Sequence, residues 1–133
     1  MISDRASFIR YFQTITQKEK VLIVVHRDPD LDAIGSALSF SMQLTALGIE
    51  NRIWVADKLG SDLMFLPSVD TIVSDYPTDF SYSLLLALDC ANLERIKGYE
   101  KLNTDVKSIN VDHHADNTGF ADINVCETIS SVG

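Results

Sequence analysis

The sequence predicts an α/β fold with an open, mostly parallel sheet and helices on both faces. Three observations lead to this prediction. Short apolar runs of strand length alternate with longer amphipathic or polar segments. The runs 21–25 and 84–88 are apolar throughout, as are strands buried on both faces of a parallel sheet. Polar clusters rich in Asp and His follow the apolar runs, at the edge where such sheets carry functional groups.

The first half of the chain is expected to supply two helices and two strands. Four apolar residues near the N-terminus recur at helical spacing and predict an amphipathic packing helix. They are Phe8, Tyr11, Phe12 and Ile15, within an expected helix over 4–17. The elements expected next are a strand over 21–25, a helix over 33–47 stopped by Gly48, and a strand over 50–56.

The second half is expected to contain shorter elements joined by more turns, because Pro67, Pro77 and polar stretches interrupt it. The expected elements are a loop over 57–68 with a helical turn at 62–66, an edge strand over 69–73, strands over 84–88, 106–111 and 121–125, and a short helix or turn over 92–98. Strands that alternate with helices in this order predict a Rossmann-like sheet.

Composition and charge exclude several classes of function. The 133 residues are 46% hydrophobic, which suits the core of one domain or part of a larger one. A net charge of −8 argues against a binding track for long nucleic acid. The same charge is compatible with a short anionic substrate held by metal ions. Asp supplies 14 of the 19 acidic residues, which favours turns, caps and cation ligands over exposed helix faces.

Localisation and cysteine usage give further expectations. No apolar run approaches the length of a membrane span, and the N-terminus lacks a signal-peptide pattern. A soluble, cytoplasmic protein without a membrane partner is therefore expected. Cys90 and Cys126 lack the close spacing of a ligand pair, so both are expected to be small buried side chains.

The first polar cluster runs from His26 to Asp32 and joins the strand over 21–25 to the following helix. It holds one imidazole and three carboxylates, and carboxylates about 4 Å apart repel by up to about 4 kcal/mol per pair. A multivalent cation among them would remove that repulsion, and imidazole with carboxylate suits Mn, Zn, Fe or Co. The alternative is turn and cap chemistry by Asp28 and Asp30, which leaves His26 unexplained.

The first turn of the helix after this cluster contains small residues. Gly35 and Ser36 would let backbone amides approach an anion at the positive end of the helix. A glycine inside a helix costs about 1 kcal/mol relative to alanine, which favours a close-approach role. Simple tight packing at Gly35 is an equal alternative.

Two more clusters follow later strands. Asp89 ends the run 84–88, and Asp112, His113 and His114 end the run 106–111. Asp89 alone is also compatible with a cap for the segment that follows. Adjacent histidines on an extended chain point in different directions, so at most one is expected to bind a given metal. Asp112 is expected to orient one of the two imidazoles.

The three clusters are expected to converge. Each directly follows a strand, and neighbouring parallel strands bring their carboxyl ends to one edge of the sheet. Six oxygen or nitrogen donors from three loops exceed the needs of one zinc-like site. They suit two cations about 3.5–4 Å apart, which clamp a phosphoryl group for in-line attack by a hydroxide.

Together these motifs resemble the DHH phosphoesterase family, and most closely its bacterial oligoribonuclease/pAp-phosphatase type. The resemblance spans roughly residues 8–133. The motifs are His26-x-x-x-Asp30-x-Asp32-Ala33, then Asp89 after an apolar strand, then Asp112-His113-His114.

The resemblance implies a phosphohydrolase with two divalent ions, usually manganese. The implied metal ligands are His26 and Asp30 for the first ion, Asp32 and His113 for the second, and Asp89 as a bridge between both. His114 would contact the substrate phosphate and assist the leaving oxygen, and Asp112 would support the adjacent histidine. Four further residues resemble family positions without an assigned role: Asn92, Arg95, Asn117 and Phe120.

The sequence departs from the family pattern in two places. The family often has an uncharged polar residue where Asp28 stands, so Asp28 is expected to be a bystander. The family's fourth-motif Asp and its DHH-associated C-terminal domain would lie beyond Gly133. We therefore expect 1–133 to be a DHH domain that is incomplete at its C-terminal end, weak or inactive alone, and part of a longer protein that forms a homodimer.

The leading functional hypothesis is metal-dependent hydrolysis of short oligonucleotides or of nucleotide 3′-phosphates such as pAp. The catalytic candidates are Asp89, Asp112 and His114, and the substrate-binding candidates are His114, Gly35 and Ser36. Two alternatives remain open: an inorganic pyrophosphatase or exopolyphosphatase of the same superfamily, and a non-catalytic nucleotide-binding regulatory domain.

Overall fold

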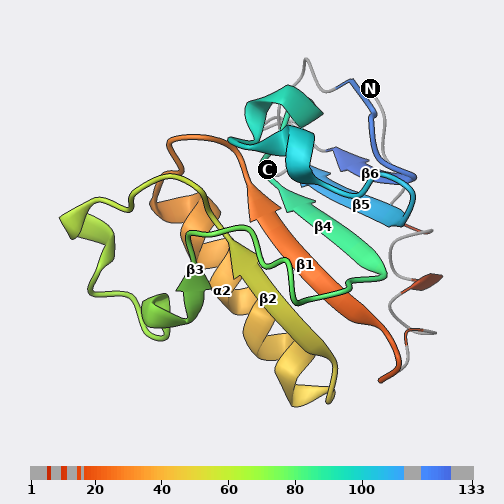
Figure 1. Cartoon of the computed structure of the whole chain (residues 1–133), viewed down its shortest axis with the longest axis horizontal. Coiled ribbons are helices and arrows are strands. Elements are labelled where there is room, and N and C mark those ends of the chain that lie inside the picture. The colour runs from red at the N-terminus through yellow and green to blue at the C-terminus, as the bar shows by residue number, and fades with distance from the viewer. Residues whose placement is uncertain (1–5, 7–9, 12–14, 16, 113–117, 127–133) are drawn as a thin grey trace.

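The computed structural model describes residues 6, 10, 11, 15, 17–112 and 118–126. Its centre is a six-stranded sheet in the order β3-β2-β1-β4-β5-β6, and every neighbouring pair is parallel (Figure 1). The strands and the long helix are β1 (Lys20–Val25), α2 (Leu31–Ala46), β2 (Glu50–Trp54), β3 (Ile72–Val73), β4 (Leu84–Leu88), β5 (Lys107–Asp112) and β6 (Ile123–Cys126). The predicted α/β fold class is thereby confirmed.

The strand order contains a switch point between β1 and β4. From β1 the chain builds the sheet outward through β2 to β3, and it then returns to add β4, β5 and β6 on the other side. In open α/β sheets ligands bind outside the carboxyl ends of the strands at such a point. The topology therefore singles out the loops that follow β1 and β4.

The two faces of the sheet have separate apolar cores. In β1, Val21, Ile23 and Val25 pack on the side of α2, whereas Leu22 and Val24 belong to the core of the opposite side. This alternation explains why the run 21–25 is apolar throughout. Figure 1 shows α2 lying along one face of the sheet. Among the described residues, loops and short 3-10 helices cover the other face, with side chains such as Phe80 and Ile96.

Helix α2 begins at Leu31, two residues before the expected start at residue 33. The reason is its N-cap, because Asp30 has an extended backbone and its Oδ1 accepts a hydrogen bond from the Ala33 amide at 2.9 Å. The expected stop is confirmed, since Leu47 is the C-cap and Gly48 follows with φ of +76°.

The other predicted boundaries differ from the structure by a few residues. The strand over 84–88 is confirmed without change, the strand over 50–56 ends at Trp54, and β5 and β6 each end one residue later than expected. Four short 3-10 helices occupy the loops: η1 (Ser61–Leu63), η2 (Val69–Thr71), η3 (Leu93–Arg95) and η4 (Tyr99–Lys101). The helical turn expected at 62–66 corresponds to η1, and much of the edge strand expected over 69–73 is η2.

The remaining expectations concern the N-terminal helix, the cysteines and the membrane. Of the helix over 4–17, the described residues 6, 10 and 11 are helical, whereas residues 15 and 17 are not, so the helix ends earlier than expected. Tyr11 packs against the core on the α2 side. The expected burial of Cys90 is confirmed, whereas the side chain of Cys126 lies outside the described part. Among the described residues, every helix is too short or too polar to cross a bilayer.

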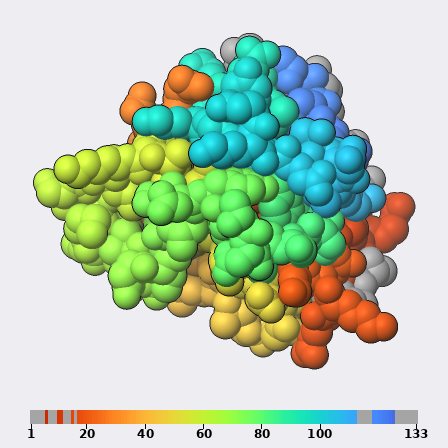
Figure 2. Space-filling view, in the orientation of Figure 1, coloured from red at the N-terminus to blue at the C-terminus, as the bar shows by residue number. Residues whose placement is uncertain are grey.

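The loop between β2 and β3 projects from one edge of the molecule (Figures 1 and 2). Its apolar side chains Met64 and Phe65 are exposed. Leu63 on the same loop is buried in the core on the α2 side, and Leu59 and Leu66 pack against that core, so the loop is anchored there while Met64 and Phe65 are exposed.

We predict that Gly98→Ala lowers the free energy of unfolding by more than about 1 kcal/mol. Gly98 has a left-handed φ of +82°, which disfavours a residue with a Cβ, and an added Cβ would lie 2.9 Å from the Trp54 ring. The matched control is Gly35→Ala within α2, where a Cβ meets no described atom within 4 Å. This control should raise the free energy of unfolding by up to about 1 kcal/mol. Urea denaturation measures both, and a Gly98→Ala variant as stable as the parent would contradict this packing.

Candidate functional site

Two side chains meet at the switch point of the sheet. Val25 of β1 lies opposite Leu88 of β4 in the parallel register, so His26 and Asp89 are the next residues on adjacent strands. His26 Nε2 lies 3.1 Å from Asp89 Oδ2, and the two side chains are 22% and 12% exposed. The pairing of β1 with β4 therefore brings together groups that are 63 positions apart in the sequence.

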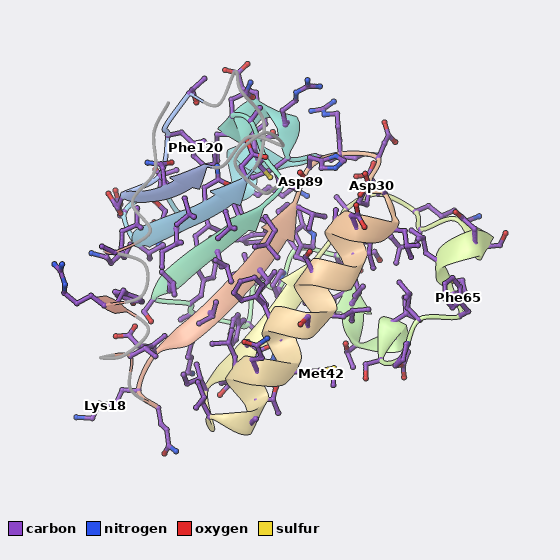
Figure 3. The ribbon with its side chains drawn as sticks, turned by 180° about the vertical axis from the view of Figure 1, so that it is seen from behind. Lys18, Asp30, Met42, Phe65, Asp89 and Phe120 are labelled. Carbon is purple, nitrogen blue, oxygen red and sulfur yellow. The ribbon has the colours of Figure 1, made fainter. Side chains whose placement is uncertain are left out.

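Asp30 completes a three-residue cluster with them. His26, Asp30 and Asp89 each offer one ligand atom, and these atoms all lie within 4.8 Å of one another. Figure 3 shows Asp30 and Asp89 close together at the same end of the sheet. One carboxylate oxygen of Asp30 caps α2, which leaves the other oxygen available for a cation.

The orientation of the His26 ring suits metal binding. Its Nδ1 lies 2.6 Å from the Arg27 carbonyl oxygen, so Nδ1 is assigned as the donor. With Nδ1 as the donor, Nε2 is the ring nitrogen left to bind a cation, and it is the atom that faces Asp89. A histidine whose second nitrogen donates to a backbone carbonyl is the usual form of a histidine ligand. One imidazole nitrogen and two carboxylates form a donor set that fits a divalent transition metal.

Asp89 has an unusual backbone conformation with φ of +62°, in the left-handed region that few residues other than glycine adopt. Strand β5 holds it there through two contacts. The Asp89 amide donates to the Val111 carbonyl at 2.8 Å, and Asn110 Nδ2 donates to the Cys90 carbonyl at 2.8 Å. The side chain of Asn110 is fully buried. These contacts fix the direction in which Asp89 leaves the sheet.

The possibility that Asp89 merely caps the following segment is wrong. The N-cap of η3 is Asn92, whose Oδ1 accepts a hydrogen bond from the Arg95 amide at 3.1 Å. Sequence reasoning assigned no role to Asn92 and missed Asn110. The available signal for Asn110 was a polar residue between the apolar residues Ile109 and Val111, just before Asp112.

Cys90 lies beside the acidic cluster but stays protonated. Burial raises the pKa of its thiol, and the nearby carboxylates of Asp112 and Asp89 raise it further. The thiol donates to the Leu88 carbonyl at 3.3 Å. Thiolate is the form that binds metals and attacks electrophiles, so Cys90 serves as packing beneath the cluster. Asp112 is buried at the end of β5, where it was expected.

The other predicted site residues lie apart from the three-residue cluster or outside the described part. Asp32, Gly35 and Ser36 line an open groove of about 500 Å³ between α2 and the projecting loop, together with Phe40 and Phe65. Asp32 does not belong to the group formed by the described ligand atoms. Among described residues nothing lies within 4 Å of a Cβ built at Gly35, so simple tight packing does not explain this glycine.

His113, His114 and Asn117 lie outside the described residues. Their roles, and the ligand set of a second ion, stay predictions. Asp28 has φ of +51° and an exposed side chain in the turn before Asp30, and it does not belong to the three-residue cluster.

The comparisons with known proteins agree with this arrangement. The model of the DHH family, N-terminal domain, matches residues 20–132. The chain is 36% identical over 107 residues to the bifunctional oligoribonuclease and PAP phosphatase NrnA of Thermus thermophilus, covering 80% of this chain and 32% of that protein. It is 32% identical over 124 residues to a probable NrnA of Streptococcus mutans, covering 90% and 39%. The chain thus spans about a third of the length of these relatives.

A solved structure shows the same fold. The crystal structure of an exopolyphosphatase-related protein from Bacteroides fragilis matches with a TM-score of 0.78 at 24% identity, covering 92% of this chain and 38% of that one. At this identity the likeness supports the fold alone.

The raised pKa of Cys90 predicts a pH dependence of stability. Above the unfolded thiol pKa of about 8.5, the unfolded chain releases the Cys90 proton and the folded chain retains it. The free energy of unfolding should therefore fall as the pH rises above about 8.5, by up to about 1.4 kcal/mol per pH unit from this group. Denaturant titrations of the parent and of Cys90→Ala measure it, because the variant should show a shallower fall. Equal slopes would contradict a buried, protonated thiol.

Proposed function

The chain belongs to the DHH family, and from that membership we propose that it is the metal-binding part of a phosphoesterase that hydrolyses short oligonucleotides or nucleotide 3′-phosphates such as pAp. The observation that carries the proposal is the cluster of His26, Asp30 and Asp89 at the switch point of the sheet. The named activities of the NrnA relatives supply the substrate class. Because this chain matches only 32% and 39% of the length of those relatives, the activity of a whole protein is part of the proposal.

His26, Asp30 and Asp89 would hold one divalent ion. Asp32 and His113 are proposed as ligands of a second ion, with Asp89 shared between the two. We propose manganese as the metal, since the mixed imidazole and carboxylate set suits it. Bound there, the ions would supply positive charge to the attacked phosphate and make water a better nucleophile.

The chain's own residues orient the donors in three ways. The left-handed turn directs Asp89 toward His26, the contact of Nδ1 with the Arg27 carbonyl sets the His26 ring, and the cap of α2 fixes Asp30. These contacts set the donor directions before any substrate binds, which lowers the reorganisation needed for reaction. Gly35 and Ser36 are proposed to contact a substrate phosphate, and His114 to assist the leaving oxygen with support for the adjacent histidine from Asp112.

We predict that Mn²⁺ stabilises the fold and that Asp30→Asn removes most of this effect. At about 100 times its dissociation constant, Mn²⁺ should add about 2.7 kcal/mol to the free energy of unfolding. Asn remains a good N-cap, so Asp30→Asn should keep the stability of the metal-free protein while it weakens Mn²⁺ binding. Thermal unfolding with Mn²⁺ and with a chelator measures both effects. A melting temperature indifferent to Mn²⁺ in the parent would count against the site.

We predict that Asp89→Ala lowers the Mn²⁺-dependent turnover of pAp and of a dinucleotide by about 100-fold or more in the full-length protein. The reason is that the substitution removes the carboxylate that is proposed to bind both ions. The control is Asp70→Ala, an exposed acid on η2 that should leave turnover unchanged. Pyrophosphate and polyphosphate complete the assay. If the protein hydrolyses pyrophosphate but none of the other substrates, the proposed substrate class is wrong. If the parent and Asp89→Ala both show the same background rate on every substrate, the chain is a non-catalytic module.

A further inference from the structure

Two arginines flank the metal-binding cluster. A cavity of about 160 Å³ opens beside His26 and Asp89, and its other lining residues are Arg27, Ala91 and Arg95. Arg27 follows His26 in the turn after β1, whereas Arg95 ends η3 in the loop after β4. The two loops that supply metal ligands therefore also supply one arginine each to the same cavity.

Specific contacts join the two arginine-bearing loops. The Arg27 amide donates to the Arg95 carbonyl at 2.5 Å, and Arg27 Nη2 donates to the Glu94 carbonyl at 3.1 Å. Asn92 caps η3 through the Arg95 amide. These contacts place the backbone of η3 against the turn after β1.

Only a few of the described basic side chains form ion pairs, although acidic residues outnumber basic ones. The sequence has 19 acidic and 11 basic residues, so acidic partners are abundant. Arg52 pairs with Asp79, and Lys97 pairs with Asp57.

Among the described residues, by contrast, the Arg95 guanidinium contacts no hydrogen-bond or ion-pair partner, and the Arg27 guanidinium has only the Glu94 carbonyl. Most of their ten N–H groups therefore have no hydrogen-bond partner among the described residues, and both residues line the cavity. A guanidinium matches the geometry of a phosphate and can bind it through two parallel hydrogen bonds.

We propose that Arg27 and Arg95 form a subsite for a second phosphate of the substrate, one that is not attacked. This inference rests on the proposed function, which places the attacked phosphate at the ligand cluster. The cavity adjoins that cluster, and a phosphate linked to the attacked one through a nucleoside would meet the two guanidinium groups. The subsite selects substrates that carry two phosphates, such as a nucleoside 3′,5′-bisphosphate, over monophosphates.

The test compares two ligands that differ by one phosphate. Titration calorimetry measures the binding of adenosine 3′,5′-bisphosphate and of adenosine 3′-monophosphate. Ca²⁺ replaces Mn²⁺ in these titrations, and the recovery of intact ligand is verified afterwards. The variants are Arg27→Gln and Arg95→Gln, and the matched control is Arg52→Gln, which removes an arginine from the salt bridge with Asp79. Each cavity variant should weaken bisphosphate binding about tenfold or more and monophosphate binding less than about threefold, since a hydrogen bond to a charged group contributes about 1.5–3 kcal/mol. Arg52→Gln should change neither.

Several outcomes would overturn the subsite. Equal weakening of both ligands would mean that the arginines bind the attacked phosphate. Unchanged binding in both cavity variants, or a parent protein that binds the two ligands equally or not at all, would also exclude it. A parent protein that prefers the bisphosphate through these arginines but does not hydrolyse it with Mn²⁺ would support the subsite and defeat the proposed function.

Discussion

The parallel pairing of β1 with β4 is the constraint on which the rest of this structure depends. It places Val25 opposite Leu88, and the next residue on each strand is a proposed metal ligand. Side chains alternate between the two faces of a strand, so a shift of one residue in this register would exchange the two apolar cores and separate His26 from Asp89. The register runs over five residue pairs, from Val21 with Leu84 to Val25 with Leu88, and alternate side chains of each strand pack into the two cores.

At the site, a carboxylate is carried by a residue with a left-handed backbone. Asp89 adopts a left-handed conformation that is uncommon outside glycine and asparagine, and it persists because Val111 and the buried amide of Asn110 hold the turn from the neighbouring strand. Asp30 combines two duties, since its Oδ1 caps α2 and its carboxylate also offers a ligand atom to the cluster. The positive end of α2 and the two arginines offset part of the repulsion among the carboxylates. The repulsion that remains between the carboxylates favours a bound cation.

The sequence revealed those features that depend on local patterns. The strand over 84–88 was recognisable from uninterrupted apolar residues, and Gly48 marked the end of α2. Asp30 and Asp89 were found because each follows a strand, and the topology brought them together as expected.

The start of α2 was misplaced because Asp30 was considered mainly as a ligand, although it is also the cap. The cap role first considered for Asp89 belongs to Asn92. Asn110 and Arg27 act through contacts between distant loops, and neither periodicity nor spacing reports such contacts. Asp32 lies on the groove side of α2, so its proposed place in a second metal site does not follow from its spacing to Asp30.

The most direct measurement is anomalous diffraction from crystals of the protein grown with saturating Mn²⁺. The account predicts a manganese peak about 2.0–2.3 Å from His26 Nε2 and from a carboxylate oxygen of both Asp30 and Asp89. Crystals in which these three side chains stay free of manganese while Mn²⁺ saturates the solution would contradict it.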